Sequence, residues 1–269
     1  MRGALSLLLV SLTAPARLHT QAPSQPSVAE HMALGDSAHA ALAPAQALRH
    51  YRAALASDST DYAALWKAAR ELVDIAKQIE GKDDSSKHLR DGLYMEARAL
   101  GEAAIRVNPN GADGHFAVAQ ALGRLSRTRG GKERVRFAKI IYDEGLKTIA
   151  LDSTHDGAYH LVGAWHAEVK RLSGFQRFFA KTLFGGGFLD KGSWDSARTY
   201  LEKAVALKPQ NIFHHLELAE VYIDLGTYSK AREQLTAIAP LPIADVLDPE
   251  YKQDATQLLQ DIKGEKDES

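Results

Sequence analysis

One short pattern occurs four times in this chain and restricts its fold more than any other feature. Each copy has a small residue, an aliphatic residue, two further residues, a polar residue and then Ser or Pro, and an apolar helical run follows it. The copies occupy residues 54–59, 104–109, 148–153 and 204–209. A motif that recurs with a helical run after each copy indicates stacked, similar units. The sequence therefore predicts an all-α solenoid built from helical hairpins.

The first unit shows how its two helices are expected to pack. Leu34 and Gly35 are expected at the close crossing of the first helix. On the second helix, small residues and one aromatic residue follow at i, i+4 and i+7, namely Ala47, Tyr51 and Ala54. Small side chains allow two helices to approach, and a large ring fills the space between them. This arrangement is typical of tetratricopeptide (TPR) repeats.

The repeat domain is predicted to contain about five helical pairs. After the first unit at residue 28, further units open near residues 62, 112, 156 and 212, and the copies of the pattern begin 50, 44 and 56 residues apart. A plain TPR unit has about 34 residues, so longer helices and loop insertions are expected. An amphipathic helix around residues 251–262 is expected to cap the last unit. The domain thus spans residues 28–262, and the charged residues 263–269 are expected to form a disordered tail.

The first 22 residues have the composition of an export signal. Arg2 precedes a largely apolar run over residues 3–13, which is too short to span a bilayer, and small residues near Ala22 suit cleavage. We expect a signal peptide over residues 1–22, a flexible mature start over residues 23–27 and export to the periplasm. The alternative is an uncleaved N-terminal membrane anchor. No other segment approaches 18 consecutive apolar residues, so no membrane span is expected in the mature chain.

Charge balance and the absence of cysteine narrow the classes of function. The net charge of −1 gives no bulk attraction to nucleic acid. Without cysteine there is no disulfide, no thiolate metal site and no cysteine nucleophile. His214 and His215 point about 100° apart on a helix, and no histidine spacing matches a metal motif, so neither a metal nor a cofactor is expected. No set of nucleophile, base and oxyanion donors is recognisable, and we expect no enzymatic activity.

A binding groove is expected on the concave side, which the first helix of each unit faces. Its second, fifth, ninth and twelfth or thirteenth positions usually face inward. In this chain they are Trp66, Arg70, Phe116, Gln120, Arg124, His160, Glu168, Phe213, Leu216 and Glu220. Aromatic and charged residues together suit an extended peptide. In the alternative interpretation, the insertions between helices fill much of this groove.

An insertion separates the two helices of the fourth unit and is predicted to be a short helix ended by three glycines. Its apolar stripe consists of Phe175, Phe178, Phe179 and Leu183, its basic face of Arg177 and Lys181, and Phe184 lies off the stripe. Such a basic, aromatic helix suits contact with a lipid or a peptide. The other interpretation is that it folds into the concave side and completes the core.

The fourth unit and its insertion also carry a family resemblance. Residues 159–165 read Tyr-His-Leu-Val-Gly-Ala-Trp, and residues 175–184 contain Phe-Gln-Arg, Ala-Lys and Leu-Phe in that order. Together with residues 66–70 and 252–259, they resemble the regulator of microtubule dynamics proteins over roughly residues 60–262. The resemblance implies an all-helical repeat domain without a known catalytic centre, whose animal members are linked to microtubules and organelle membranes. We carry over the fold and the class of binding module, but not the partner, because a bacterial type of export signal does not fit a microtubule partner.

The sequence therefore predicts a non-catalytic adaptor or scaffold that binds a protein or peptide. The alternative is binding of a lipid or amphipathic small molecule in the groove. A continuous apolar pocket would favour lipid, whereas a groove lined by charges and aromatic residues would favour peptide. A buried cluster of His and Glu with shifted pKa values near His160 and Glu168 would instead favour an enzyme.

Overall fold

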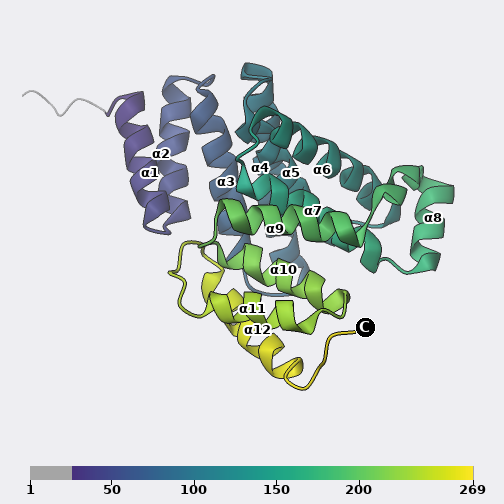
Figure 1. The fold of residues 1–269 in the computed structure, drawn as a ribbon. Helices are drawn as coiled ribbons and strands as arrows, with labels where there is room; N and C mark the ends of the chain where they lie inside the picture. The colour runs from purple at the N-terminus through teal and green to yellow at the C-terminus, as the bar shows by residue number, and fades with distance from the viewer. Residues whose placement is uncertain (1–25, 269) are drawn as a thin grey trace, which may run out of the picture.

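The computed structural model describes residues 26–268, which form α-helices and two short 3-10 helices and contain no strand (Figure 1). The helices are α1 (Val28–Ala40), α2 (Pro44–Ser57), α3 (Tyr62–Lys77), α4 (Asp84–Val107), α5 (Ala112–Leu125), η1 (Ser126–Thr128), α6 (Gly131–Leu151), α7 (Asp156–Arg171), α8 (Gly174–Phe184), η2 (Gly186–Lys191), α9 (Trp194–Leu207), α10 (Ile212–Asp224), α11 (Tyr228–Ile238) and α12 (Asp248–Asp261). None of the helices in this range is long and apolar enough to cross a membrane. The expected signal peptide and most of the expected flexible start lie outside the described residues.

The recurring sequence pattern forms the same turn in all four places. The N–H of its polar residue donates to the carbonyl oxygen of its first residue, as Asn108 does to Ala104 at 2.8 Å. Three residues later, an N–H bonds back to the carbonyl oxygen of the polar residue, as Gly111 does to Asn108 at 3.0 Å. The next helix then begins at residue 62, 112, 156 or 212, which are the predicted openings. A local turn therefore sets the repeat boundaries.

The helices pack in pairs along the chain, and this confirms the predicted solenoid of helical hairpins. The pairs are α1 with α2, α3 with α4, α5 with α6, α7 with α9, and α10 with α11. Two features account for the long spacing between units. The second helices α4 and α6 have 24 and 21 residues, and α8 is inserted between α7 and α9.

Small residues stand where paired helices approach each other. A Cβ atom on Gly35 would lie 2.4 Å from Cε1 of the buried Tyr51, and one on Gly163 would lie 2.7 Å from Cγ of Leu201. These crossings exclude any side chain at the glycines. Leu34, expected at the same crossing as Gly35, is 45% exposed. Its direction differs because adjacent residues point about 100° apart on a helix.

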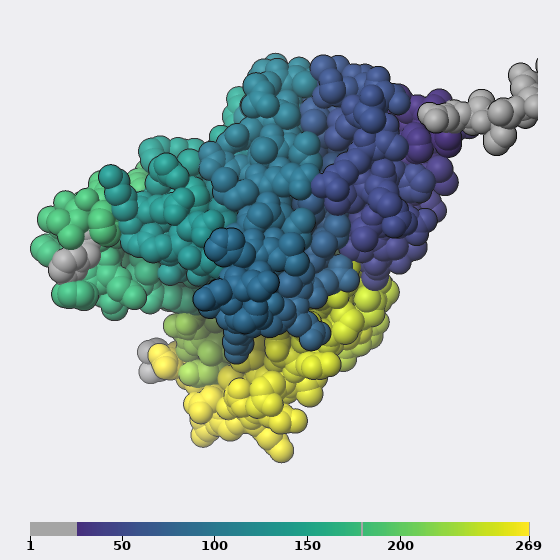
Figure 2. Space-filling view, turned by 180° about the vertical axis from the view of Figure 1, so that it is seen from behind, coloured from purple at the N-terminus to yellow at the C-terminus, as the bar shows by residue number. Residues whose placement is uncertain are grey.

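The solenoid curves so that its C-terminal helices lie beneath its N-terminal repeats, from the front (Figure 1) and from behind (Figure 2). An ion pair of 3.1 Å joins Lys77 at the end of α3 to Asp245, which precedes α12. This contact connects the second unit with the C-terminal part of the chain. The curvature therefore brings the two arms of the solenoid together around the concave side, which stays partly open to solvent.

The C-terminal helix α12 packs on α10 and α11 and buries Tyr251 and Ala255, as expected of a cap. The residues after it also have a defined path. Ser229 N–H donates to Asp267 Oδ1 at 2.7 Å, and Glu268 N–H donates to the Gly226 carbonyl oxygen at 2.9 Å. Residues 265–268 thus lie against α11, where the composition predicts disorder.

Candidate binding site on the concave face

A cavity of about 1070 Å³ lies on the concave side of the solenoid. The first helices of four successive units, α3, α5, α7 and α10, supply most of its wall, and α6 and α8 close one end. The volume is in the range of sites that hold a small molecule or several residues of a peptide. The insertions therefore bound the groove at one end but leave a large cavity.

The structure brings together eight of the ten predicted groove residues. The cavity is lined by Trp66, Arg70, Phe116, Gln120, Arg124, His160, Glu168 and Phe213. Leu216 and Glu220 do not line it. The inward face of α10 runs through Phe213, His214 and Glu217. Leu216 lies beside that face and is buried in the core formed with Tyr251, and Glu220 lies one turn further along the same edge.

One half of the cavity is apolar. Trp165, Val169, Leu172 and Leu189 contribute to it, together with Phe184 from α8. The indole N–H of Trp165 donates to the Ala138 carbonyl oxygen at 2.8 Å, so the polar atom of this ring is satisfied, and the Tyr142 ring packs on it with the ring centroids 4.3 Å apart. This half can accept an apolar side chain or an acyl chain.

Helix α8 does not bury the whole of its predicted apolar stripe. Phe178 is 61% exposed and Leu183 is 60% exposed, so part of the predicted apolar stripe does not complete the core. Phe175 lines the cavity although it is 72% exposed, and Phe184, which lies off the stripe, packs inward. The side chain of Phe179 is not among those that the structure describes.

The basic residues of the insertion hold α8 in place. The Arg177 guanidinium donates to three carbonyl oxygens at the end of α7, those of Val169, Lys170 and Leu172, at 3.2–3.3 Å. Lys181 pairs with Asp190 of η2. Gly185 ends the helix at a φ of 70°, a conformation that glycine adopts at little cost. Arg177 and Lys181 therefore support the end wall and do not face a ligand.

The other half of the cavity is polar and carries charges of both signs. Arg70 lies over the Trp66 ring at 5.3 Å and pairs with Glu71 at 2.8 Å. Arg124 lies over the Phe213 ring at 5.8 Å, and among the described residues no carboxylate comes within ion-pair distance of it. Arg124 thus presents a half-buried positive charge to the cavity without a carboxylate partner.

A chain of four titratable residues crosses the cavity wall between α7 and α10. Nε2 of His214 lies 2.8 Å from Oδ2 of Asp156, and the Nδ1 atoms of His214 and His160 are 3.1 Å apart. Nε2 of His160 lies 3.7 Å from Oε2 of Glu217. This is a buried cluster near His160 of the kind that would favour an enzyme.

The shifted pKa values indicate which atoms of these four residues carry protons. Burial lowers the pKa of His160, and the nearby His214 and Arg124 act in the same direction. Burial also lowers the pKa of His214. It raises the pKa of Glu217, although the charge of Arg171 acts to lower it. With both histidines neutral, His214 Nε2–H donates to Asp156 and His160 Nδ1–H donates to His214 Nδ1. His160 Nε2 is then the one ring nitrogen of the pair that can accept a hydrogen bond from a ligand.

Next to these four residues, Arg171 at the end of α7 is surrounded by carboxylates. It lies 2.8 Å from Asp224, 3.4 Å from Glu220 and 3.7 Å from Glu217. Burial raises the pKa of Glu220 to about 7, and the charge of Glu217 adds to the effect. Glu168 also lies 3.3 Å from Arg171, and one guanidinium does not compensate for four ionised carboxylates, so this cluster costs stability when all of them are charged.

Glu220→Gln is expected to stabilise the protein at pH 8 but not at pH 4.5. The folded state holds the Glu220 proton more tightly than the unfolded chain, so the wild type loses stability as the pH rises from about 4.5 to about 7. The side chain is 40% exposed, so solvent screening limits the gain to about 1 kcal/mol. Urea unfolding at the two pH values measures it. Glu250→Gln, at an exposed position of α12, controls for net charge, and an equal gain at both pH values would contradict the assignment.

Several residues of the site were not found from the sequence. Asp156, His214 and Glu217 belong to the cavity wall, and Trp165 and Lys77 line its two halves. His160 and His214 are 54 residues apart and are the fifth residue of α7 and the third residue of α10, so their contact joins non-equivalent positions of two units and has no signal in the repeat pattern.

Paired helices, a repeated inter-unit turn and a cavity on the concave face define a TPR-like helical-repeat protein. Residues 32–263 match the family model described as "Regulator of microtubule dynamics protein 1-3". The chain belongs to this family, as its resemblance predicted.

Relatives and a solved structure agree with this assignment. The chain is 28% identical over 204 residues to regulator of microtubule dynamics protein 1 from Bos taurus, covering 75% of this chain and 62% of that protein. It is 25% identical over 195 residues to protein 3 from Rattus norvegicus, covering 72% of this chain and 40% of that protein. A thermophilic TPR protein from Thermus thermophilus superimposes with a TM-score of 0.62 at 18% identity, over 87% of this chain and all of that chain. That likeness concerns the fold alone.

Proposed function

We propose that this chain is a non-catalytic interaction scaffold that holds an extended segment of a partner protein in its concave cavity. The observation that supports this most directly is the composition of the cavity wall. Aromatic residues such as Trp66 and Phe116 alternate there with cations and carboxylates such as Arg124 and Glu217. Peptides present backbone polar groups and varied side chains, so a wall of this mixed kind suits them.

The two halves of the cavity suggest which peptide it accepts. An apolar side chain fits against Trp165 and Phe184, and a carboxylate fits opposite Arg124, which has no carboxylate partner among the described residues. A half-buried guanidinium gains a charge-assisted hydrogen bond when it receives such a group. The preferred segment therefore combines an apolar residue with an acidic residue or a C-terminal carboxylate.

The solenoid also favours binding for an entropic reason. Each unit packs on its neighbours, and Lys77 with Asp245 ties the two arms of the curve together. A wall that is already ordered loses little freedom when a ligand binds. The names of the relatives refer to microtubule dynamics, and this proposal concerns only the binding of a protein segment.

Lipid binding is the competing proposal and has one supporting feature, the apolar half of the cavity. An acyl chain would contact Trp165, Val169 and Leu172 there. The remainder of the wall would then be left with charged groups such as Arg124 and Asp156, which an acyl chain cannot satisfy. We therefore place the peptide first and test for lipid in the same experiment.

The pair of histidines gives little support to a hydrolytic site. Both ring nitrogens of His214 are engaged, and the two hydroxyl groups that line the cavity are committed elsewhere. Thr154 Oγ1 donates to Asp152 at 2.7 Å, and Ser126 Oγ donates to the Gly123 carbonyl oxygen at 2.8 Å. His160 Nε2 thus has an available lone pair, but its lowered pKa makes it a weak base and no nucleophile among the described residues lies beside it. Its proposed role is to accept a hydrogen bond from the peptide.

A phage-displayed library of random 12-residue peptides tests the proposal. We expect selection against the immobilised protein to enrich acidic and apolar peptides, and Arg124→Gln to weaken their binding about tenfold or more. Arg106→Gln, at an exposed position of α4, should bind as the wild type does. Native mass spectrometry of gently purified protein runs in parallel. A co-purifying lipid mass together with no peptide enrichment would overturn the proposal in favour of lipid.

A further inference from the structure

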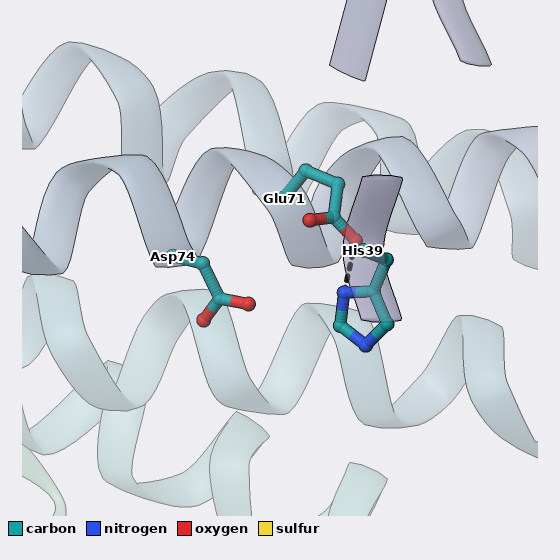
Figure 3. Close-up of side chains that lie close together, drawn as sticks. All are labelled: His39, Glu71 and Asp74. Carbon is teal, nitrogen blue, oxygen red and sulfur yellow. Dashed lines mark ion pairs between the residues drawn. The ribbon is translucent and has the colours of Figure 1, made fainter. Parts of the chain in front are cut away.

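A second cluster of polar residues lies outside the concave cavity, between the first and second units. His39 in the last turn of α1 faces Glu71 and Asp74, which are one turn apart on α3 (Figure 3). One nitrogen or oxygen atom of each residue lies within 4.8 Å of the corresponding atoms of the other two. Two carboxylates and an imidazole at such distances are groups that can hold a metal ion together.

Glu71 is the unusual member of this cluster, since its side chain is fully buried. Its Oε1 accepts a hydrogen bond from Arg70 Nε at 2.9 Å and lies 2.9 Å from His39 Nδ1. Its Oε2 is also buried but has no hydrogen-bond partner among the described residues. In Figure 3 this second oxygen points to the side on which Asp74 lies. A buried carboxylate oxygen without a partner is costly, so a further group is expected to satisfy it.

The space beside Glu71 is large enough for such a group. A small cavity of about 20 Å³ is lined by His39, Glu71 and Asp74, and by Leu42, Pro44 and the segment 244–246. This volume holds one ion or one water molecule. Leu42 adopts a φ of 55°, which is unfavourable for a leucine, so the α1–α2 turn at the edge of this cavity is strained.

The charges around the cavity leave ligand atoms available. Lys77 pairs with Oδ1 of Asp74 at 2.7 Å, which leaves Oδ2 to face another group. Arg70 uses only Oε1 of Glu71. Glu71 and Asp74 thus each use a single oxygen for a neighbouring cation, Arg70 and Lys77. Each carboxylate keeps its second oxygen, on which a further cation can bind.

We propose that His39, Glu71 and Asp74 bind one divalent transition-metal ion, for which Zn²⁺ fits the ligand set best. One imidazole nitrogen and two carboxylate oxygens match its preference for mixed N and O ligands, and water completes a tetrahedral site. Glu71 Oε2 would thereby gain its missing partner. Histidine spacing along the chain gives no sign of this site, because its ligands come from two different units.

Such an ion would connect the first unit to the second. Helix α1 packs mainly on α2, and α2 in turn packs on α3. A metal held by His39 on α1 and by two residues on α3 would tie the terminal helix directly to its second neighbour. Binding is therefore expected to slow hydrogen exchange in α1 and to raise the melting temperature by roughly 5 °C at a hundredfold excess over the Kd.

The primary experiment is isothermal titration calorimetry, in which ZnSO₄ is titrated into tag-free protein. We expect saturable binding of one ion per chain, with a Kd that rises about tenfold or more in His39→Gln and in Glu71→Gln. The His39 side chain is 35% exposed, so His39→Gln is expected to fold even if Glu71→Gln does not. His88→Gln, at an exposed position of α4, is the matched control and should bind as the wild type does.

Two results would overturn the proposal. Absence of binding at a ratio of one ion per chain would mean that the small cavity holds a water molecule only. Binding that persists in His39→Gln but disappears in His160→Gln would place the ion at the histidine pair of the concave cavity. On addition of Zn²⁺, we expect hydrogen exchange in α1 to slow in the wild type but not in His39→Gln. A purely structural role of His39 would not produce this difference.

Discussion

Ala104→Phe is expected to destabilise the protein by about 3 kcal/mol or more and to lower its melting temperature by roughly 6–12 °C. Ala104 is fully buried on the face of α4 that contacts α5. A Cβ atom on Gly114 would lie 3.2 Å from the Ala104 Cβ, and one on Gly101 would lie 2.9 Å from a methyl of Val118. The two helices are thus already in close contact, and a phenyl ring must push them apart. Thermal unfolding followed by circular dichroism at 222 nm measures the effect.

Ala56→Phe provides the matched control for this prediction. It adds the same ring at an exposed position of α2, where we expect a change within about 0.5 kcal/mol. Because repeat units can unfold separately, hydrogen exchange should show the loss of protection concentrated in α4 and α5. A melting curve for Ala104→Phe that matches the wild type would mean that this crossing is not the one that sets the repeat register.

The fold could be predicted because its determinants are local. The hydrogen bonds of the turn at Asn108 involve only residues 104–111, and the same bonds recur at the other three copies. Helix starts therefore follow directly from the sequence pattern. Small residues such as Gly35 could likewise be placed at crossings, because only glycine fits there. Leu34 shows the limit of this reasoning, since one step along the helix changes a residue from the crossing to the surface.

The site could be predicted only in part because it depends on how each helix is rotated in the finished solenoid. The inward positions hold for α3, α5 and α7, which place Trp66, Phe116 and His160 on the cavity. On α10 the same positions include Leu216, which the capping helix draws into the core. Contacts between units, such as His160 with His214, do not follow from any spacing along the chain.

The orientation of α8 follows from side-chain anchors and not from hydrophobicity. An apolar stripe normally predicts the buried face of a helix. Here Arg177 caps the end of α7 and Phe184 packs inward, and Phe184 would clash with any Cβ atom at Gly131, at 2.8 Å. These anchors turn Phe178 and Leu183 toward the surface. The sequence pattern shows which face of a helix is apolar. It does not show which face packs against the neighbouring helices.

The combined variant Trp66→Ala and Phe116→Ala is expected to weaken binding of a selected peptide about a hundredfold and to leave helicity unchanged. Both rings line the cavity and are held firmly. Trp66 lies beside the Lys67 ammonium and the Arg70 guanidinium, and Phe116 packs on the His155 ring at 4.4 Å. Rings held in this way lose little freedom on binding, so their removal takes away most of the apolar contact with the ligand. Fluorescence polarisation with a labelled peptide measures the change.

Phe178→Ala distinguishes the cavity from the outer face of α8 as the binding surface. It removes one exposed aromatic ring that does not line the cavity, so peptide binding should be unchanged. Circular dichroism must show that the double variant is folded, because Phe116 also contacts the start of α7 at Gly157. A folded double variant that binds as tightly as the wild type would exclude the concave cavity. If Phe178→Ala then lost binding, the outer face of α8 would be the peptide site, and the mixed wall of the cavity would need another explanation.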